Sequence, residues 1–437
     1  MKNVREGYKM TELGEIPKEW EIIKLNECGY IFGGNAFKSS SFTTEYKEND
    51  YQVIRMGNVQ LGKLDLEKNP VFLSENLVCE KEKKYLLKEE DILISLTGTV
   101  NKTDYGNISW VDRNNKYLLN QRVGCLRNDN GEFNNRYYYY LLQSNMFRNQ
   151  FFECGVGGTG NQANVSIADL NNIKVLKVPI REQEKIASVL STVDEQIDNV
   201  DALIEKNKEL KKGLIQTLLT KGIGHTKFKK TEIGEIPEEW QVESMNEIVI
   251  STQLGTNTLG RECDDIPMLK MGNLTIGGFD LNKLEYISEE ELEENGEYIL
   301  NNGDFLFNTR NTLDLVGKSA VWNGQINKAI FNSNIMRIKY CNKINDFYMG
   351  YYFSSDIGWK QLKSISTGTT SVAAIYTKDL MKIKVIIPSI GEQEKIVSIL
   401  LEVDKKIEEY ENKKQKLEEL KKGLMQQLLT GMIRVTV

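Results

Sequence analysis

The chain has 437 residues, of which 40% are hydrophobic and 27% charged, and its formal net charge is −6. This composition is typical of a globular protein of about two or three domains, and the negative charge argues against a uniformly basic nucleic-acid binder. No apolar run reaches the ~18 residues of a membrane span, and the N-terminal residues lack the apolar stretch of a secretory signal, so we expect a cytoplasmic protein. The six cysteines are scattered and form no CxxC pair. We therefore expect reduced, mostly buried thiols and no zinc site.

The first distinctive segment, TELGEIPKEW at residues 11–20, returns as TEIGEIPEEW at residues 231–240. Pro17 and Pro237 fix the backbone within each copy. Trp20 and Trp240 are candidate apolar anchors of a docking segment, and filling the core of their own domain is the alternative.

Between the two copies, short alternating segments predict strands at residues 71–74, 91–95, 107–111 and 122–126. Residues 136–151 predict an amphipathic helix whose four consecutive tyrosines suit either a core or the stacking of bases. A last strand is predicted within residues 171–179. The first globular unit is therefore expected to be α+β.

Residues 182–220 predict a long helix, because apolar side chains recur at alternating intervals of four and three residues. This spacing is typical of a coiled-coil seam, and Lys211 interrupts it in a way that sets register. The predicted seam residues are Ile186, Leu190, Val193, Ile197, Leu214 and Leu218.

The second half repeats this order. Strands are predicted at residues 286–289, 304–308, 318–322 and 335–340, a helix at 347–362, and a final strand within 381–388. The closing helix, residues 392–430, matches residues 182–220 without a gap. Its predicted seam residues are Ile396, Leu400, Val403, Ile407, Leu424 and Leu428, and Lys421 interrupts the seam.

The chain is thus one unit of about 210–220 residues written twice. If each globular unit sits on its helix in the same way, the two helices run antiparallel. The end of the second helix then meets the first decapeptide through space, as the end of the first helix meets the second decapeptide along the chain.

Catalytic motifs are missing. The chain's one histidine, His225, lies in a linker, which leaves no histidine-based triad or metal cluster. The GxxxxGK string at residues 57–63 is followed by Leu64 where a P-loop needs Ser or Thr. No dinucleotide fingerprint and no Asn-Pro-Pro-aromatic motif for methylating an exocyclic amine are present.

Two diverged units alternate with two near-identical helices that open PxxxEQEKI and close LKKGLxQxLLT, and TExGEIPxEW precedes each unit. This combination resembles the specificity subunit of type I restriction-modification systems over essentially the whole chain. The resemblance implies a non-catalytic α+β protein with an internal pseudo-two-fold repeat, in which two target-recognition domains are separated by two long helices pairing as an antiparallel coiled coil.

The expected layout is a first target-recognition domain with its docking segment at 1–181, a first spacer helix and linker at 182–230, a second domain at 231–391, and a second spacer helix and tail at 392–437. The resemblance implies that each domain reads half of a bipartite site in double-stranded DNA. It also implies two modification (methyltransferase) subunits and restriction (translocase and nuclease) subunits as partners. S-adenosylmethionine, ATP and Mg²⁺ would be bound by those partners, and no cofactor by this chain.

Base contacts are expected from loops that carry Arg, Lys, Asn and Gln. The Gly-rich stretches at 155–160 and 366–370 either bring backbone N–H groups to phosphate or form plain turns. The candidate contact residues are Lys38, Ser39, Arg55, Asn58, Thr159, Asn161 and Gln162 in the first unit, and Gln253, Asn257, Lys270, Asn273, Arg310, Asn311, Thr367 and Thr369 in the second.

Two other functions remain open on the residues alone. One is an architectural coiled-coil scaffold that binds proteins at both ends without DNA specificity. The other is a self-contained DNA enzyme, against which the missing motifs argue.

Overall fold

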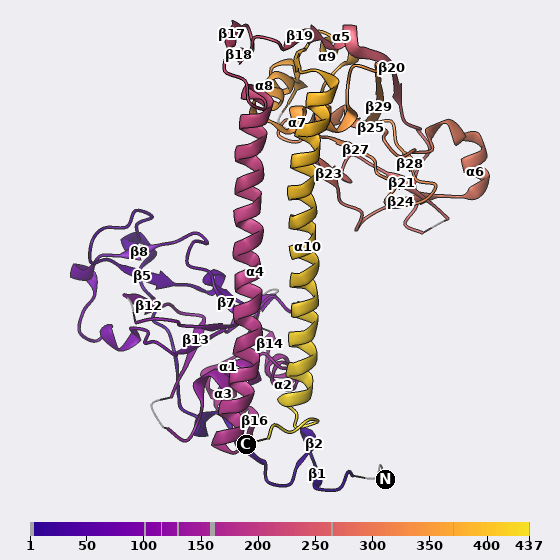
Figure 1. Cartoon of the computed structure of the whole chain (residues 1–437). Helices are drawn as coiled ribbons and strands as arrows, with labels where there is room; N and C mark the ends of the chain where they lie inside the picture. The colour runs from indigo at the N-terminus through magenta and orange to yellow at the C-terminus, as the bar shows by residue number, and fades with distance from the viewer. Residues whose placement is uncertain are drawn as a thin grey trace. The chain divides into compact units, whose positions relative to one another are not determined.

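The computed structural model describes residues 4–99, 102–114, 116–128, 131–157, 162–263, 265–369 and 371–436. Two compact units are formed, Met1–Val200 with Lys413–Val437, and Asp201–Asn412. Helices α4 (Ile180–Lys221) and α10 (Ile390–Leu428) each contribute one half to either unit. They are the longest helices in Figure 1 and both begin two residues before the predicted starts at 182 and 392.

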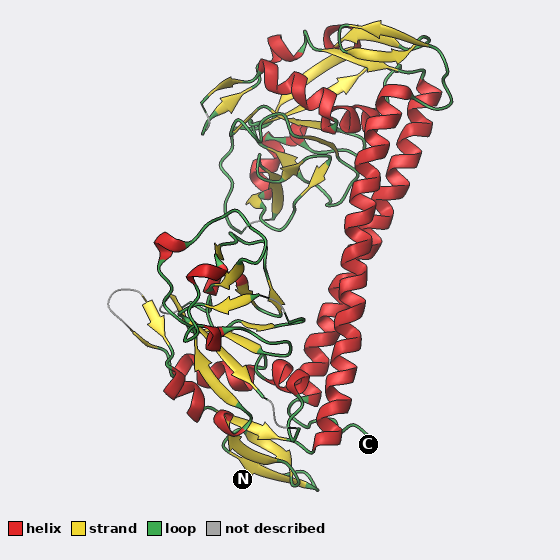
Figure 2. Ribbon diagram, turned by 90° about the vertical axis from the view of Figure 1, so that its left-hand side faces the viewer, coloured by secondary structure: helices red, strands yellow, loops and turns green. Residues whose placement is uncertain are grey.

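The two long helices lie side by side and run in opposite directions (Figure 1 and Figure 2). In the first unit Lys421 of α10 pairs with Asp194 of α4, and in the second Lys211 of α4 pairs with Asp404 of α10. Numbers that rise along one helix therefore fall along the other, which confirms the predicted antiparallel pairing. The predicted seam residues are all buried or half-buried.

The first unit is built from short strands around one four-stranded sheet. The strand order of this sheet is β11-β9-β13-β4, and the unit also contains a three-stranded sheet with the order β12-β5-β8. The strands are β1 (Tyr8–Thr11), β2 (Gly14–Pro17), β3 (Glu21–Lys24), β4 (Tyr30–Gly33), β5 (Tyr51–Ile54), β6 (Val59–Gln60), β7 (Lys63–Leu64), β8 (Phe72–Leu73), β9 (Ile92–Ser95), β10 (Thr97–Thr99), β11 (Ile108–Trp110), β12 (Tyr117–Leu119), β13 (Val123–Arg127), β14 (Val156–Gly157), β15 (Gln162–Asn164) and β16 (Lys174–Lys177).

The second unit has the same kind of strands in the same succession. They are β17 (Phe228–Thr231), β18 (Gly234–Pro237), β19 (Gln241–Ser244), β20 (Val249–Leu254), β21 (Ile266–Leu269), β22 (Leu274–Thr275), β23 (Gly278–Phe279), β24 (Glu285–Ile287), β25 (Phe305–Asn308), β26 (Arg310–Asn311), β27 (Ser319–Val321), β28 (Ile330–Phe331), β29 (Ile335–Tyr340), β30 (Thr367–Gly368), β31 (Ala373–Ala374) and β32 (Lys384–Ile387).

Strand order is the same in the two units, although their sequences have diverged. The sheets β20-β29-β25-β27, β24-β21-β28 and β26-β31-β30 repeat β4-β13-β9-β11, β8-β5-β12 and β10-β15-β14. Both units pair one strand in parallel, β12 with β5 and β28 with β21, whereas their other named strand pairs are antiparallel. The duplication therefore includes the globular parts. Each strand predicted from the sequence overlaps a strand of the structure.

Each predicted short helix is in fact two. The segment 136–151 contains α1 (Asn135–Leu141) and α2 (Asn145–Glu153), and 347–362 contains α7 (Asp346–Ser354) and α8 (Asp356–Ile365). The break comes from serine: the hydroxyl of Ser144 accepts from the Phe147 N–H, and that of Ser355 from the Gly358 N–H. A serine that caps a new helix ends the previous one. The other helices are α3 (Ile167–Asn172), α5 (Met245–Ile248), α6 (Glu289–Glu294) and α9 (Thr377–Leu380).

The largest core of each unit joins the globular part to the long helices. In the first, Trp20 and the four tyrosines 137–140 pack with Ile186, Leu190 and Leu429. In the second, Trp240 and Tyr348 pack with Leu219 and Ile396. The tyrosines are no more than 2% exposed, so they belong to the core and not to a base-stacking surface.

The cysteines depart from expectation. All six are free thiols, but Cys28 and Cys125 alone are buried, Cys79 and Cys263 are exposed, and the other two are intermediate. "Mostly buried" was therefore wrong, because two cysteines lie in surface loops outside the strands. Within the described residues no helix is long and apolar enough to cross a membrane.

Candidate nucleic-acid interface

A small three-stranded sheet in the second unit gathers four of the predicted contact residues. Strand β31 lies between β26 and β30, so that Arg310 and Thr367 both face Ala374 in the register. Arg310, Thr367 and Thr369 are exposed, and Asn311 is half-buried. The backbone of Arg310 belongs to the β26–β31 ladder, but its guanidinium makes no hydrogen bond or ion pair within the part of the chain that the structure describes. An unengaged guanidinium among hydroxyl groups can donate to a base edge or a phosphate.

The first unit repeats this sheet with β10, β15 and β14. Exposed Gln162 faces Thr99 across the ladder. Asp104 accepts from the backbone N–H of Thr99 at 2.8 Å and from its hydroxyl at 2.7 Å, and these bonds hold the pKa of the carboxyl below its usual range. The predicted residues Thr159 and Asn161 lie outside the described residues.

Asn58 and Asn273 hold their own loops together. Asn58 is 2% exposed, and its amide donates to the carbonyls of Asp65 and Lys68 while its oxygen accepts from the Arg55 N–H. Asn273, 5% exposed, makes the three equivalent bonds to Asp280, Lys283 and Lys270. All polar atoms of both side chains have protein partners in this conformation.

The cations of the same loops are also engaged. Arg55 donates to the carbonyl of Asn69 at 2.6 Å, and Lys270 lies 2.5 Å from Glu285. Both are half-buried, and both remain close to solvent.

The remaining candidates lie on two further loops. Lys38 and Ser39 are exposed where a 3₁₀ turn, Ser39–Ser41, begins. Asn257 is exposed, but Gln253 accepts from the guanidinium of Arg337 and donates to Glu297. Gln253 therefore ties strand β20 to β29 and to the loop that carries Glu297.

Two residues that the sequence analysis did not consider, Thr97 and Thr99 of strand β10, lie in the same small sheet as Gln162. The hydroxyl of Thr97 donates to Asn164 at 2.9 Å, which links β10 to β15. The signal was the string LTGT at 96–99, which stands after its strand as TRNT does at 309–312 after the other.

The glutamate that opens each EQE motif makes hydrogen bonds or ion pairs at the junction where a long helix meets a decapeptide segment. Glu392 accepts from Trp240 Nε1 at 2.9 Å, from the Ile223 N–H at 3.0 Å and lies 2.9 Å from His225 Nε2. Glu182 instead forms a bidentate pair with Arg434, whose Nε lies 2.9 Å away. Arg434 therefore stands at the first junction where His225 stands at the second, and Trp20 Nε1 is left without a partner.

The glutamine of the motif holds the globular part. Gln183 accepts from the N–H of Asn134, the N-cap residue of α1. Gln393 accepts in the same way from Asn345, the N-cap residue of α7. One buried glutamine per unit thus fixes the first turn of a long helix against a helix of the globular part.

The chain matches the family described as the type I restriction modification DNA specificity domain at residues 17–211 and again at 237–419. It belongs to that family, with two copies of the domain. The expected non-catalytic specificity subunit agrees with this membership.

Named relatives are of the same kind. The chain is 29% identical to the putative type I restriction enzyme MjaX specificity subunit of Methanocaldococcus jannaschii, over 98% of this chain and 97% of the relative. It is 24% identical to the EcoKI specificity subunit of Escherichia coli K12, over 88% and 82%. The crystal structure of the S subunit from M. genitalium shares the fold, with a TM-score of 0.55 at 16% identity, over 94% of this chain and 96% of that one.

Proposed function

We propose that this chain is the DNA-reading subunit of a type I restriction-modification complex, and that each globular unit reads one half of a split site. The observation that carries the proposal is the repeated strand order of the two units, each with a small polar sheet, on a pair of antiparallel helices. Two readers related by a pseudo-two-fold axis match inverted half-sites, since duplex DNA has the same symmetry.

Local groups supply the contacts in this proposal, because the chain carries a net charge of −6. Arg310, Asn311, Thr367 and Thr369 are the proposed set in the second unit, and Gln162, with Thr159 and Asn161, in the first. Lys38, Ser39 and Asn257 extend these sets from neighbouring loops. Asn58, Asn273 and Gln253 act as supports that shape the loops, and Arg55 and Lys270 reach phosphate only after exchanging their present partners.

The partners belong to the proposal as well. Two modification subunits dock on the long helices and bring S-adenosylmethionine, and restriction subunits bring ATP and Mg²⁺. The chain itself holds no cofactor and works in the cytoplasm. The long helices set the number of base pairs between the half-sites.

The test is methylation of a random duplex library by the chain assembled with its modification subunits. The expected product is one split motif with adenine methylation in both halves. A second assembly, in which residues 305–380 come from a relative, should change one half of that motif and leave the other half and the gap unchanged. Assembly without any preference for sequence would favour the scaffold function, and methylation or cleavage by the chain alone would favour a self-contained enzyme.

A further inference from the structure

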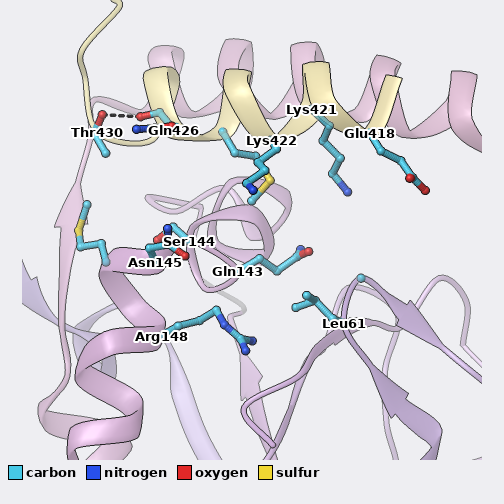
Figure 3. Close-up of a pocket in the computed structure, with 13 residues that line it drawn as sticks. Leu61, Gln143, Ser144, Asn145, Arg148, Glu418, Lys421, Lys422, Gln426 and Thr430 are labelled. Carbon is cyan, nitrogen blue, oxygen red and sulfur yellow. Dashed lines mark hydrogen bonds between the residues drawn. The ribbon is translucent and has the colours of Figure 1, made fainter. Parts of the chain in front are cut away.

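Each unit contains a groove of the same construction. In the first, a volume of about 450 Å³ lies between the tip of hairpin β6–β7, the junction of α1 and α2, and the last turns of α10. Figure 3 shows Leu61 of the hairpin and Arg148 of α2 facing the α10 side chains of Lys421 and Lys422. In the second unit about 470 Å³ lies between hairpin β22–β23, the junction of α7 and α8, and the last turns of α4.

The two grooves are lined by equivalent residues. Lys421, Lys422 and Met425 of the first are 210 positions beyond Lys211, Lys212 and Ile215 of the second. Leu61 and Ile276 occupy the same place in their hairpins, directly before Gly62 and Gly277. The globular units have diverged, and yet both complete the groove in the same way.

Each hairpin tip carries an exposed apolar side chain that is not part of a hydrophobic core. Leu61 is 54% exposed and Ile276 is 53% exposed. The following glycines have φ of +78° and +76°, which explains the glycine but not the large apolar residue beside it. Together with half-buried Met425 in the first groove, or half-buried Ile215 in the second, the exposed residue forms a small apolar patch suited to a partner. Polar and charged side chains make up most of the remaining lining.

Basic side chains outnumber acidic ones in the lining of each groove, where Glu418 of the first and Asp356 of the second are the acidic residues named. Lys421 and Lys211 are held by Asp194 and Asp404. Lys422 and Lys212 are exposed and have no ion pair among the described residues. A ligand that fits must therefore combine an apolar group, which contacts the apolar patch, with an anionic group, which pairs with the free ammonium. A DNA phosphate satisfies only the second requirement.

We propose that each groove receives an amphipathic segment of a partner protein, with one apolar anchor beside Leu61 or Ile276 and an acidic residue beside Lys422 or Lys212. Because the two grooves have the same chemistry, one kind of partner occupies both, and the stoichiometry is two per chain. This inference rests on the proposed function, in which that partner is the modification subunit. It assigns part of the docking surface to the hairpins of the globular units in addition to the long helices.

The experiment uses the full chain and the modification subunit, with complexes counted by native mass spectrometry and affinities taken from titration. The first-groove variant is Leu61→Asp with Lys422→Glu, and the second-groove variant is Ile276→Asp with Lys212→Glu. Each is expected to bind one partner as wild type does and the other at least ~10-fold more weakly, as loss of a central apolar anchor and a charge pair implies. Combining all four changes should weaken the binding of both partners at least ~10-fold, because the two grooves are separate sites.

The matched controls are Lys416→Glu and Lys206→Glu, which are exposed on the same helices, are related by the repeat and lie outside the grooves. They should bind two partners as wild type does. Milder Leu61→Ser and Ile276→Ser variants, with unchanged thermal unfolding, guard against misfolding. Groove variants that take up two partners with wild-type affinity would overturn the inference, and so would partner binding that is retained while DNA binding falls. Neither result would affect the DNA-reading proposal, which stands or falls on the methylated motif.

Discussion

The ammonium of Lys421 lies 2.6 Å from Oδ1 of Asp194, and the hydroxyl of Tyr140 donates to Oδ2 of the same carboxylate at 2.6 Å. The repeat of this arrangement joins Lys211, Asp404 and Tyr351, with distances of 2.5 and 2.7 Å. Each carboxylate thus connects both long helices to a helix of the globular part. A shift of one helix by a single turn would separate both ion pairs, so the pairs fix the register.

Removing one member of such a pair should destabilise the chain more than removing an ordinary surface charge. Lys421→Met is expected to lower the free energy of unfolding by ~1–3 kcal/mol, since it leaves the largely buried carboxylate of Asp194 with only the more distant Arg136, at 3.9 Å, as a cationic partner. Adding Asp194→Asn should restore part of the loss. Chemical unfolding of the four proteins of this cycle measures the coupling. Lys406→Met, whose partner Glu402 is exposed, is the control and should change stability by less than ~0.5 kcal/mol.

Lengthening the spacer should require both helices. Seven residues inserted after Ala202 and seven after Asn412 add ~10 Å to each helix and keep both ion pairs in register. The gap between half-sites should grow by about three base pairs, at ~3.4 Å each, with both half-sites unchanged. The methylated motif of each variant gives the result. The same insertion in α4 alone should reduce assembly, because one ion pair must then be lost, and a lengthened gap from that single insertion would contradict the ruler.

Arg310→Ala should weaken one half-site only. A guanidinium that contacts a base is worth ~1–3 kcal/mol of discrimination, so affinity for the half-site read by the second unit should fall roughly 5- to 150-fold. Binding of the assembled complex to duplexes changed in either half measures this effect. Lys283→Ala, which removes an exposed cation outside the small sheet, is the control. If Arg310→Ala lowers the affinity for all duplexes equally, whatever their sequence, Arg310 contacts phosphate and not a base.

Stability should depend on pH through Asp346. Burial raises the pKa of this carboxyl to about 6, against an ordinary value of 3.8. The folded chain then keeps the proton to higher pH than the unfolded chain does, so this contribution to stability is present below about pH 4 and is lost as pH rises through about 6. Asp346→Asn should therefore raise Tm relative to wild type at pH 7.5 and have little effect at pH 4.5.

Asp169 supplies the opposite sign. Hydrogen bonds from the Ser166 hydroxyl and backbone lower the pKa of Asp169, so its contribution is present above the ordinary pKa and is lost as pH falls through the lowered value. Asp169→Asn should lower Tm at pH 7.5. Thermal unfolding of the two variants across this range checks both signs, and parallel curves would refute the assignment to Asp346.

Two glycines of the linker separate backbone strain from packing. Gly222 and Gly224 both have positive φ, +64° and +76°, so alanine at either should cost ~1–2 kcal/mol. A Cβ at Gly222 would also lie 2.5 Å from Trp240 Cζ2, whereas one at Gly224 meets nothing within 4 Å. Gly222→Ala should therefore cost a further ~1–3 kcal/mol, as overpacking does. Urea unfolding of both variants compares the two terms.

The antiparallel pairing of the two long helices was predictable from the sequence. Helix periodicity shows where each helix lies, and the order of the repeated segments along the chain then implies that the two helices run in opposite directions. The breaks at Ser144 and Ser355 were not predicted, since a serine in an amphipathic run looks like any surface residue until its hydroxyl is seen to accept a backbone N–H. The common strand order of the two units was also hidden, because strands of two to six residues carry too little pattern to be matched after divergence.

The site residues were harder, for a physical reason. Asn58 and Arg310 both have side chains that suit a base edge, but sequence does not show where the polar atoms of a side chain are already used. The amide of Asn58 is engaged by its own loop, whereas the guanidinium of Arg310 has no described partner. His225 likewise had no assigned role, since its partner Glu392 is 167 residues away.

The junction at the chain ends makes the order of the two halves a matter of convention. Tyr8 donates to the carbonyl of Gly431 at 2.8 Å, and Arg434 donates to Glu19 and Glu182, so the two ends of the chain meet within the first unit. Their junction is the counterpart of the linker at 222–227, which joins helix α4 to the second decapeptide within the second unit. The two halves are thus joined covalently by the linker at one junction and by non-covalent contacts of the chain ends at the other. A gene that starts within the linker and fuses the present ends would encode the same set of contacts, with the second reader written first.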